Sequence, residues 1–211
     1  MGVSGTEDAF IFLGMVAFVS LSGVMAPGPM FATTIAKGYN DLRAGLKISF
    51  GHAVVEIPLI AAIFLGFDTV LKNDMVFIAI GLIGGVILLI FGLDQIRTRN
   101  SKAIQKDNGR SSFLSGIIMS AANPYFILWW ATIGATLIAG AVKFGPIMLP
   151  IFAAVHLSCD FAWNYLLSYS VYKSKKIWNE RWHRYLFVAS GGIMVFFGLY
   201  FLASSVQSLL A

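Results

Sequence analysis

Long apolar runs alternate with short polar stretches along the whole chain. Each run reaches or exceeds the roughly 20 helical residues that are needed to cross the hydrocarbon core of a bilayer. The runs lie at 9–36, 45–67, 75–96, 113–139, 144–171 and 185–207. The pattern predicts an all-α membrane protein in which six transmembrane helices form a single domain over residues 1–211.

Positive charges between the predicted spans fix an orientation. Counted from the N-terminal segment to the C-terminal tail, the Lys and Arg residues number 0, 3, 1, 5, 1, 5 and 0. Cytoplasmic loops of membrane proteins are enriched in Lys and Arg. The alternation therefore places loops one, three and five in the cytoplasm and both termini outside.

Composition agrees with a polytopic membrane protein: 58% of the residues are hydrophobic and 12% are charged. The net charge of +5 then reflects basic cytoplasmic loops rather than nucleic-acid binding. The single cysteine, Cys159, excludes disulfides within the chain and cysteine-rich metal centres. We expect a multi-pass protein of the cell membrane that contacts lipid and needs no cofactor.

Three landmarks recur in the same order in the segments 9–98 and 113–207. The segments 26–31 (APGPMF) and 122–126 (ANPYF) come first, then two His-xxx-acid pairs, then 85–93 (GVILLIFGL) and 191–199 (GGIMVFFGL). Because three spans separate the copies, equivalent helices cross the membrane in opposite directions. The pattern predicts a 3+3 inverted repeat, which is common among secondary transporters.

Two acidic residues, Glu56 and Asp160, lie deep within predicted spans. His52 and His156 each precede one of them by four residues, which puts each pair on one helix face. An ionisable group inside a membrane costs at least ~2.5 kcal/mol and points to function. Such a carboxylate can take up and release protons near neutrality, and the histidine can share the proton.

Proline and glycine interrupt two of the predicted spans. Pro27, Gly28 and Pro29 remove backbone hydrogen bonds from the first, and Asn123 with Pro124 does the same in the fourth. A half-helix that begins there presents free N–H groups that suit a carboxylate. Together with the two acids, these breaks would bind both ends of an amino-acid zwitterion.

Residues near these motifs receive weaker interpretations. Trp163 and Asn164, about one turn beyond Asp160, are candidates to line the same cavity. Trp129 and Trp130 are expected to pack within the protein or to face lipid.

These motifs resemble those of the LysE/RhtB amino-acid exporters, a family within the lysine exporter superfamily. The likeness covers most of the chain and is carried by segments 26–31, 45–56 (GLKISFGHAVVE) and 122–130 (ANPYFILWW), and by Asp160 with Trp163. The resemblance implies export of amino acids from the cytoplasm, driven by protons or the membrane potential. It also implies alternating access at a midplane site formed by the broken helices and the two acids.

One alternative function remains open at this stage. A divalent metal ion would also suit two histidines and two carboxylates that converge from two helices, here His52, Glu56, His156 and Asp160. A metal transporter is therefore the second hypothesis. An intramembrane enzyme is not expected, because no nucleophile is associated with an oxyanion-binding feature. Glycines in the third and sixth spans would permit a homodimer.

Overall fold

The computed structural model describes residues 3–26, 28–66, 74–97, 111–174 and 180–210. Every regular element among these residues is helical, as the sequence predicts. The elements are α1 (Val3–Val24), α2 (Pro29–Gly38), α3 (Ala44–Phe64), α5 (Asp74–Arg97), α7 (Ser112–Ala121), α8 (Pro124–Trp129), the π-helix η1 (Trp130–Gly134), α9 (Ala135–Val142), α10 (Met148–Ser174) and α11 (Glu180–Leu210).

Five helical segments are long and apolar enough to cross a membrane. They are Glu7–Val24, Ala44–Phe64, Asp74–Asp94, Pro124–Val142 and Gly191–Leu210. The fifth predicted span, 144–171, corresponds to the 27-residue helix α10, which is outside this set. At 1.5 Å per residue α10 is about 40 Å long, which exceeds a hydrocarbon core of about 30 Å. Its buried polar residues, which include His156, Asp160 and Asn164, lower its hydropathy.

Both predicted helix breaks are present. The first apolar run divides into α1, which ends at Val24, and α2, which begins at Pro29. In the second half, Ala122 and Asn123 separate α7 from α8, which begins at Pro124. Proline is favoured at the first position of a helix because that position needs no intrahelical N–H donor. Each proline therefore starts a new helix instead of kinking an old one.

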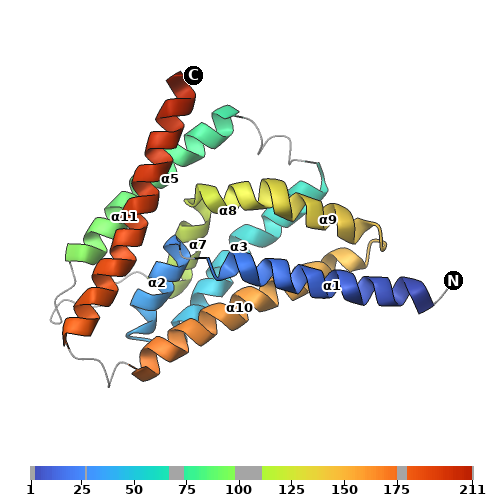
Figure 1. The fold of residues 1–211 in the computed structure, drawn as a ribbon, viewed down its shortest axis with the longest axis horizontal. Helices are drawn as coiled ribbons and strands as arrows, with labels where there is room; N and C mark the ends of the chain where they lie inside the picture. The colour runs from blue at the N-terminus through green and yellow to red at the C-terminus, as the bar shows by residue number, and fades with distance from the viewer. Residues whose placement is uncertain (1–2, 27, 67–73, 98–110, 175–179, 211) are drawn as a thin grey trace.

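The helices form two groups in Figure 1. The α5–α11 pair lies at one side, where the two helices contact each other along much of their length. In the other group α3 packs on α7 and α10, and α1 packs on α10. The short helix α2 contacts both α10 and α11, so it joins the two groups.

Glycines let the backbones of α3 and α7 approach closely. A Cβ added at Gly51 would overlap the carbonyl oxygen of Phe113, and one at Gly116 would overlap the carbonyl oxygen of Ile48. Small residues at such crossings are a regular feature of membrane helices, where packing replaces the hydrophobic effect as the force between helices. This contact holds His52, on α3, against Ser120, on α7.

The largest cluster of buried apolar side chains lies between α1, α3, η1, α9 and α10. It includes Phe12, Val16, Ile60, Trp130 and Phe152. Large apolar side chains such as Phe10, Phe18 and Phe196 are more than 60% exposed, which is expected of surfaces that face lipid.

We expect Gly116→Ala to destabilise the fold by about 1–3 kcal/mol, because the new methyl group must displace the backbone of α3. Gly192→Ala is the matched control, since a Cβ there meets nothing within 4 Å. Thermal unfolding of the two variants in the same detergent tests this. Equal melting temperatures would contradict the close α3–α7 contact.

Candidate functional site

A cavity of about 340 Å³ lies where the helix breaks meet α3, α10 and α11. Its lining residues come from both halves of the chain. They are Ser20, Gly23, Val24, Ala26, Gly28, Pro29, Met30, Phe31, His52, Glu56, Ser120, Asn123, Tyr125, Phe126, Trp129, Trp130, His156, Asp160, Asn164 and Phe197.

Four ionisable side chains meet in this cavity and form the carboxylate–histidine cluster: His52, Glu56, His156 and Asp160. Nε2 of His52 lies 3.0 Å from Oε1 of Glu56, and Nε2 of His156 lies 3.1 Å from the same oxygen. The Nε2 atoms are farther from the Asp160 carboxylate, at 3.8 Å for His52 and 3.5 Å for His156. All four side chains are buried. The two His–acid pairs that the sequence predicts on separate helices therefore form one cluster.

A serine holds the other side of each histidine ring. Nδ1 of His52 lies 2.6 Å from the hydroxyl of Ser120, and Nδ1 of His156 lies 2.7 Å from that of Ser20. Both serines stand in the half-helix that precedes a break, Ser20 in α1 and Ser120 in α7. Each histidine therefore has one ring nitrogen fixed by a hydroxyl and the other turned toward the carboxylates.

Trp130 completes the surroundings of Glu56. Its indole N–H donates to Oε1 of Glu56 at 3.1 Å, and the side chain is fully buried. It is the first residue of η1, and π-helical turns occur often at functional sites. A Cβ at Gly134, the last residue of η1, would overlap the Trp130 ring. The absence of a side chain at Gly134 is therefore what makes room for this indole.

The helix that follows the first break begins without a side-chain cap. Gly28 is the N-cap of α2 in an extended conformation, and the first backbone bond of the helix runs from the N–H of Ala32 to the carbonyl of Gly28. The early N–H groups of a helix have no intrahelical partner. At the second break the Asn123 side chain accepts from the N–H of Tyr125 and so caps α8.

A buried polar network lies next to the cluster on α10. The Asn164 amide donates to the Ser49 hydroxyl at 3.1 Å and accepts from the Thr34 hydroxyl at 3.2 Å. The Ser49 hydroxyl in turn donates to the backbone carbonyl of Asp160. The network connects α2, α3 and α10 beside the site.

Most residues that the sequence singles out meet at this cavity. Gly28, Pro29 and Asn123 line it together with the four members of the cluster. Pro124 is buried beside it without lining it. Trp163 lies outside the lining, and its buried indole N–H has no hydrogen-bond partner in the part of the chain that the structure describes. Pro27 lies outside the described residues.

Two tryptophans that seemed unremarkable in the sequence belong to the site. Both pack within the protein, as expected, since they are buried in the apolar cluster, but the sequence did not indicate that both line the cavity or that Trp130 bonds to Glu56. Ser20 and Ser120 were also missed. A serine in an apolar span usually bonds to the backbone of its own helix. The sequence does not show when its partner is instead a histidine 136 residues away, as for Ser20 and His156.

The cluster has the residue types of a metal site, since ligand atoms of His52, Glu56 and Asp160 all lie within 4.8 Å of one another. Oε1 of Glu56, however, already accepts the N–H of Trp130, which is a donor that cannot ligate a metal. The same oxygen lies at hydrogen-bond distance from both histidines. Oε1 of Glu56 is thus occupied by contacts with three nitrogens, whereas Oε2 has no hydrogen-bond partner among the described residues.

Comparisons with known proteins identify a family of translocators, and the name of one of two relatives describes amino-acid efflux. The LysE type translocator model matches residues 21–205. A curated relative from Bacillus subtilis (strain 168), named "Putative amino acid efflux protein YcgF", is 24% identical over 95% of this chain and 99% of its own length. The chemotactic transduction protein ChpE of Pseudomonas aeruginosa is 24% identical over 88% of this chain and 94% of its own. No solved structure matches.

These matches confirm the resemblance that the sequence motifs indicated, and they describe a translocator rather than an enzyme. They do not favour metal transport. With its long apolar helices, the chain is a multi-pass protein of the cell membrane and belongs to the LysE type translocator family.

Proposed function

We propose that this protein exports amino acids from the cytoplasm by secondary active transport through the cavity around the carboxylate–histidine cluster. The observation that carries the proposal is the pair of buried carboxylates, Glu56 and Asp160, in a cavity beside two helix breaks. Family membership and the name of the Bacillus subtilis relative support the same function.

The cavity offers partners for both ends of an amino acid. The carboxylates of Glu56 and Asp160 suit an ammonium group, and the uncapped N-terminus of α2 suits a carboxylate. Broken helices that present their ends to a buried cavity are the usual way in which secondary transporters bind small ions and zwitterions.

The proposed mechanism is alternating access in a 3+3 inverted repeat, with α10 as the fifth of six spans and residues 9–98 and 113–207 as the two repeats. The α5–α11 contact supports a two-fold relation. Gly85 approaches the carbonyl of Gly198, while Gly92 and Gly191 approach each other's carbonyls. If Gly85 corresponds to Gly191 and Gly92 to Gly198, a two-fold axis exchanges these two contacts. The His52–Ser120 and His156–Ser20 pairs are exchanged in the same way.

Hydrogen bonding supports protons as the coupling ion. The Ser120 hydroxyl donates to the carbonyl of Gly116 at 2.7 Å, so it accepts at its contact with Nδ1 of His52. That nitrogen therefore carries a hydrogen. Nε2 of His52 then faces Oε1 of Glu56 at 3.0 Å, a contact that is favourable only if a proton lies between them. A cationic cargo that binds Glu56 would compete with this proton for the carboxylate. That competition would couple the movement of cargo to the movement of protons.

Removing either carboxylate should stop transport. We expect Glu56→Gln and Asp160→Asn each to lower counterflow of amino acids in proteoliposomes by roughly tenfold or more, because each change removes a charge that the cargo ammonium needs. Asp41→Asn is the control, since it makes the same carboxyl-to-amide change at a pair with Lys47 outside the cavity. Wild-type counterflow in both cavity variants would contradict the proposed site.

Proton coupling predicts a response to a pH gradient. In vesicles loaded with amino acid, an acidic external medium should speed net efflux several-fold in the wild type, because protons enter as cargo leaves. Counterflow, which needs no net proton movement, should remain unchanged. Efflux that responds to the membrane potential and not to pH would leave export in place and exclude protons as the coupling ion.

The proposed orientation can be tested by labelling. In a Cys159→Ser background, a cysteine at Lys143 should react with a membrane-impermeant maleimide in intact cells. A cysteine at Asn108 should react only after permeabilisation, because the third loop is predicted to be cytoplasmic. Labelling of both positions from outside would contradict the six-span topology.

A further inference from the structure

We propose that the cargo is an α-amino acid with an uncharged, apolar side chain. This inference rests on the proposed export function and narrows it. It comes from the polar groups of the cavity, which divide into those already bonded within the protein and those that a cargo must satisfy.

The polar atoms left for the cargo belong to two carboxylates. Among the described residues, the buried side-chain nitrogen and oxygen atoms without a hydrogen bond are Oε2 of Glu56, Oδ2 of Asp160 and the indole nitrogen of Trp163. The first two belong to residues that line the cavity. Glu56 is 1% exposed and Asp160 is 3% exposed, so bulk water reaches neither well. An ammonium group, with three N–H donors and no acceptor, fits such a pair.

The cargo carboxylate has a separate place at the start of α2. Met30 and Phe31 stand in the first turn of this ten-residue helix, where backbone N–H groups lack intrahelical acceptors, and both residues line the cavity. Gly28 keeps the approach open, since a Cβ there would meet nothing closer than the Ala26 carbonyl oxygen at 3.9 Å. The two charged ends of the cargo are thus assigned to different elements.

Four further polar side chains of the lining are bonded within the protein, and Tyr125 and Trp129 also line the cavity with a hydroxyl and an indole N–H. Ser20 and Ser120 contact the histidines, the Asn123 side chain caps α8, and Asn164 bonds to Thr34 and Ser49. Beside these four side chains, a cargo hydroxyl, amide or additional charge would have to break one of their bonds or be buried without a partner. Either outcome costs free energy that an apolar side chain avoids.

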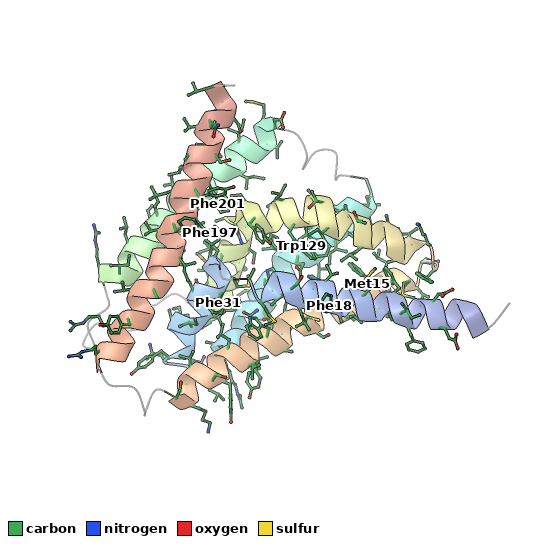
Figure 2. All side chains as sticks on the ribbon, viewed as in Figure 1. Met15, Phe18, Phe31, Trp129, Phe197 and Phe201 are labelled. Atoms are coloured by element: carbon green, nitrogen blue, oxygen red, sulfur yellow. The ribbon has the colours of Figure 1, made fainter. Side chains whose placement is uncertain are left out.

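Aromatic and aliphatic side chains make up much of the rest of the wall. They come from four helices: Val24 on α1, Phe31 on α2, Phe126 and Trp129 on α8, and Phe197 on α11. Figure 2 shows Phe31 on α2, Trp129 on α8 and Phe197 on α11 around the middle of the molecule. The volume of about 340 Å³ is at the low end of the roughly 300–1,000 Å³ of small-molecule sites, so one amino acid would fill much of it.

Lysine fits this cavity poorly although it is cationic. Ligand oxygens of Glu56 and Asp160 lie within 4.8 Å of each other, so the two carboxylates form one ammonium site rather than two. Lysine holds its ammonium groups at opposite ends of a four-carbon stem. Its second charge would therefore lie against the apolar wall. A glutamate cargo would bring an additional carboxylate to the same wall.

The test is competition in counterflow with the full-length wild-type protein in proteoliposomes. Leucine, methionine and phenylalanine should compete at least about tenfold better than lysine, glutamate or threonine. If lysine, glutamate or threonine competes best, the inference is wrong while export of amino acids stands. If none of the common amino acids drives counterflow, the proposed function itself fails.

A substitution in the wall gives an independent measurement. Phe197→Glu should admit lysine by providing a partner for its second ammonium, and Phe197→Gln, which has nearly the same size and no charge, should not. Lysine competition that stays at the wild-type level in a folded Phe197→Glu protein would contradict the placement of the cargo side chain. Should these variants not fold, the wild-type competition series still decides.

Discussion

The structure depends on the contact between two buried carboxylates and two buried histidines. A charge in a membrane protein is costly to bury, and the cost falls only when partners are held in good geometry. Here Oε1 of Glu56 is within about hydrogen-bond distance of three nitrogens, those of His52, His156 and Trp130. These nitrogens come from α3, α10 and η1. The cluster can exist only if those three elements, from both halves of the chain, are packed in one register.

Several features of the fold follow from this requirement. The close α3–α7 contact that Gly51 and Gly116 allow brings Ser120 to His52. The π turn that begins at Trp130 directs its indole toward Glu56. The polar residues along α10 that belong to the cluster lower its hydropathy, and α10 is outside the set of five segments that are long and apolar enough to cross a membrane. The same polar residues that build the site therefore weaken the hydropathy signal of the helix that carries them.

Local patterns in the sequence predicted part of this arrangement well. A spacing of four residues put His52 with Glu56 and His156 with Asp160, and prolines marked the starts of α2 and α8. Properties of this kind depend only on neighbours along one helix. The role of Trp130 could not be found in the same way, because its partner lies 74 residues away and its ring depends on a local π turn. Nothing in the sequence of a tryptophan pair distinguishes a lipid anchor from a hydrogen-bond donor.

The sequence pattern also does not explain why the two carboxylates differ in their distances to the histidine nitrogens. Glu56 and Asp160 each follow a histidine by four residues, yet the histidine nitrogens lie 3.0 and 3.1 Å from Glu56 and 3.5 and 3.8 Å from Asp160. The surroundings along α10 also differ. His156 stacks on Phe152 of the apolar cluster, whereas Asn164, one turn beyond Asp160, bonds to Ser49 in the polar network. Because the nitrogen atoms of the protein lie farther from the Asp160 carboxylate, a cationic cargo, as proposed, would have more charge compensation to offer there. Two similar motifs thus carry one carboxylate with three close nitrogen contacts and one with fewer, and under the proposed function the second is the better acceptor for the cargo ammonium group.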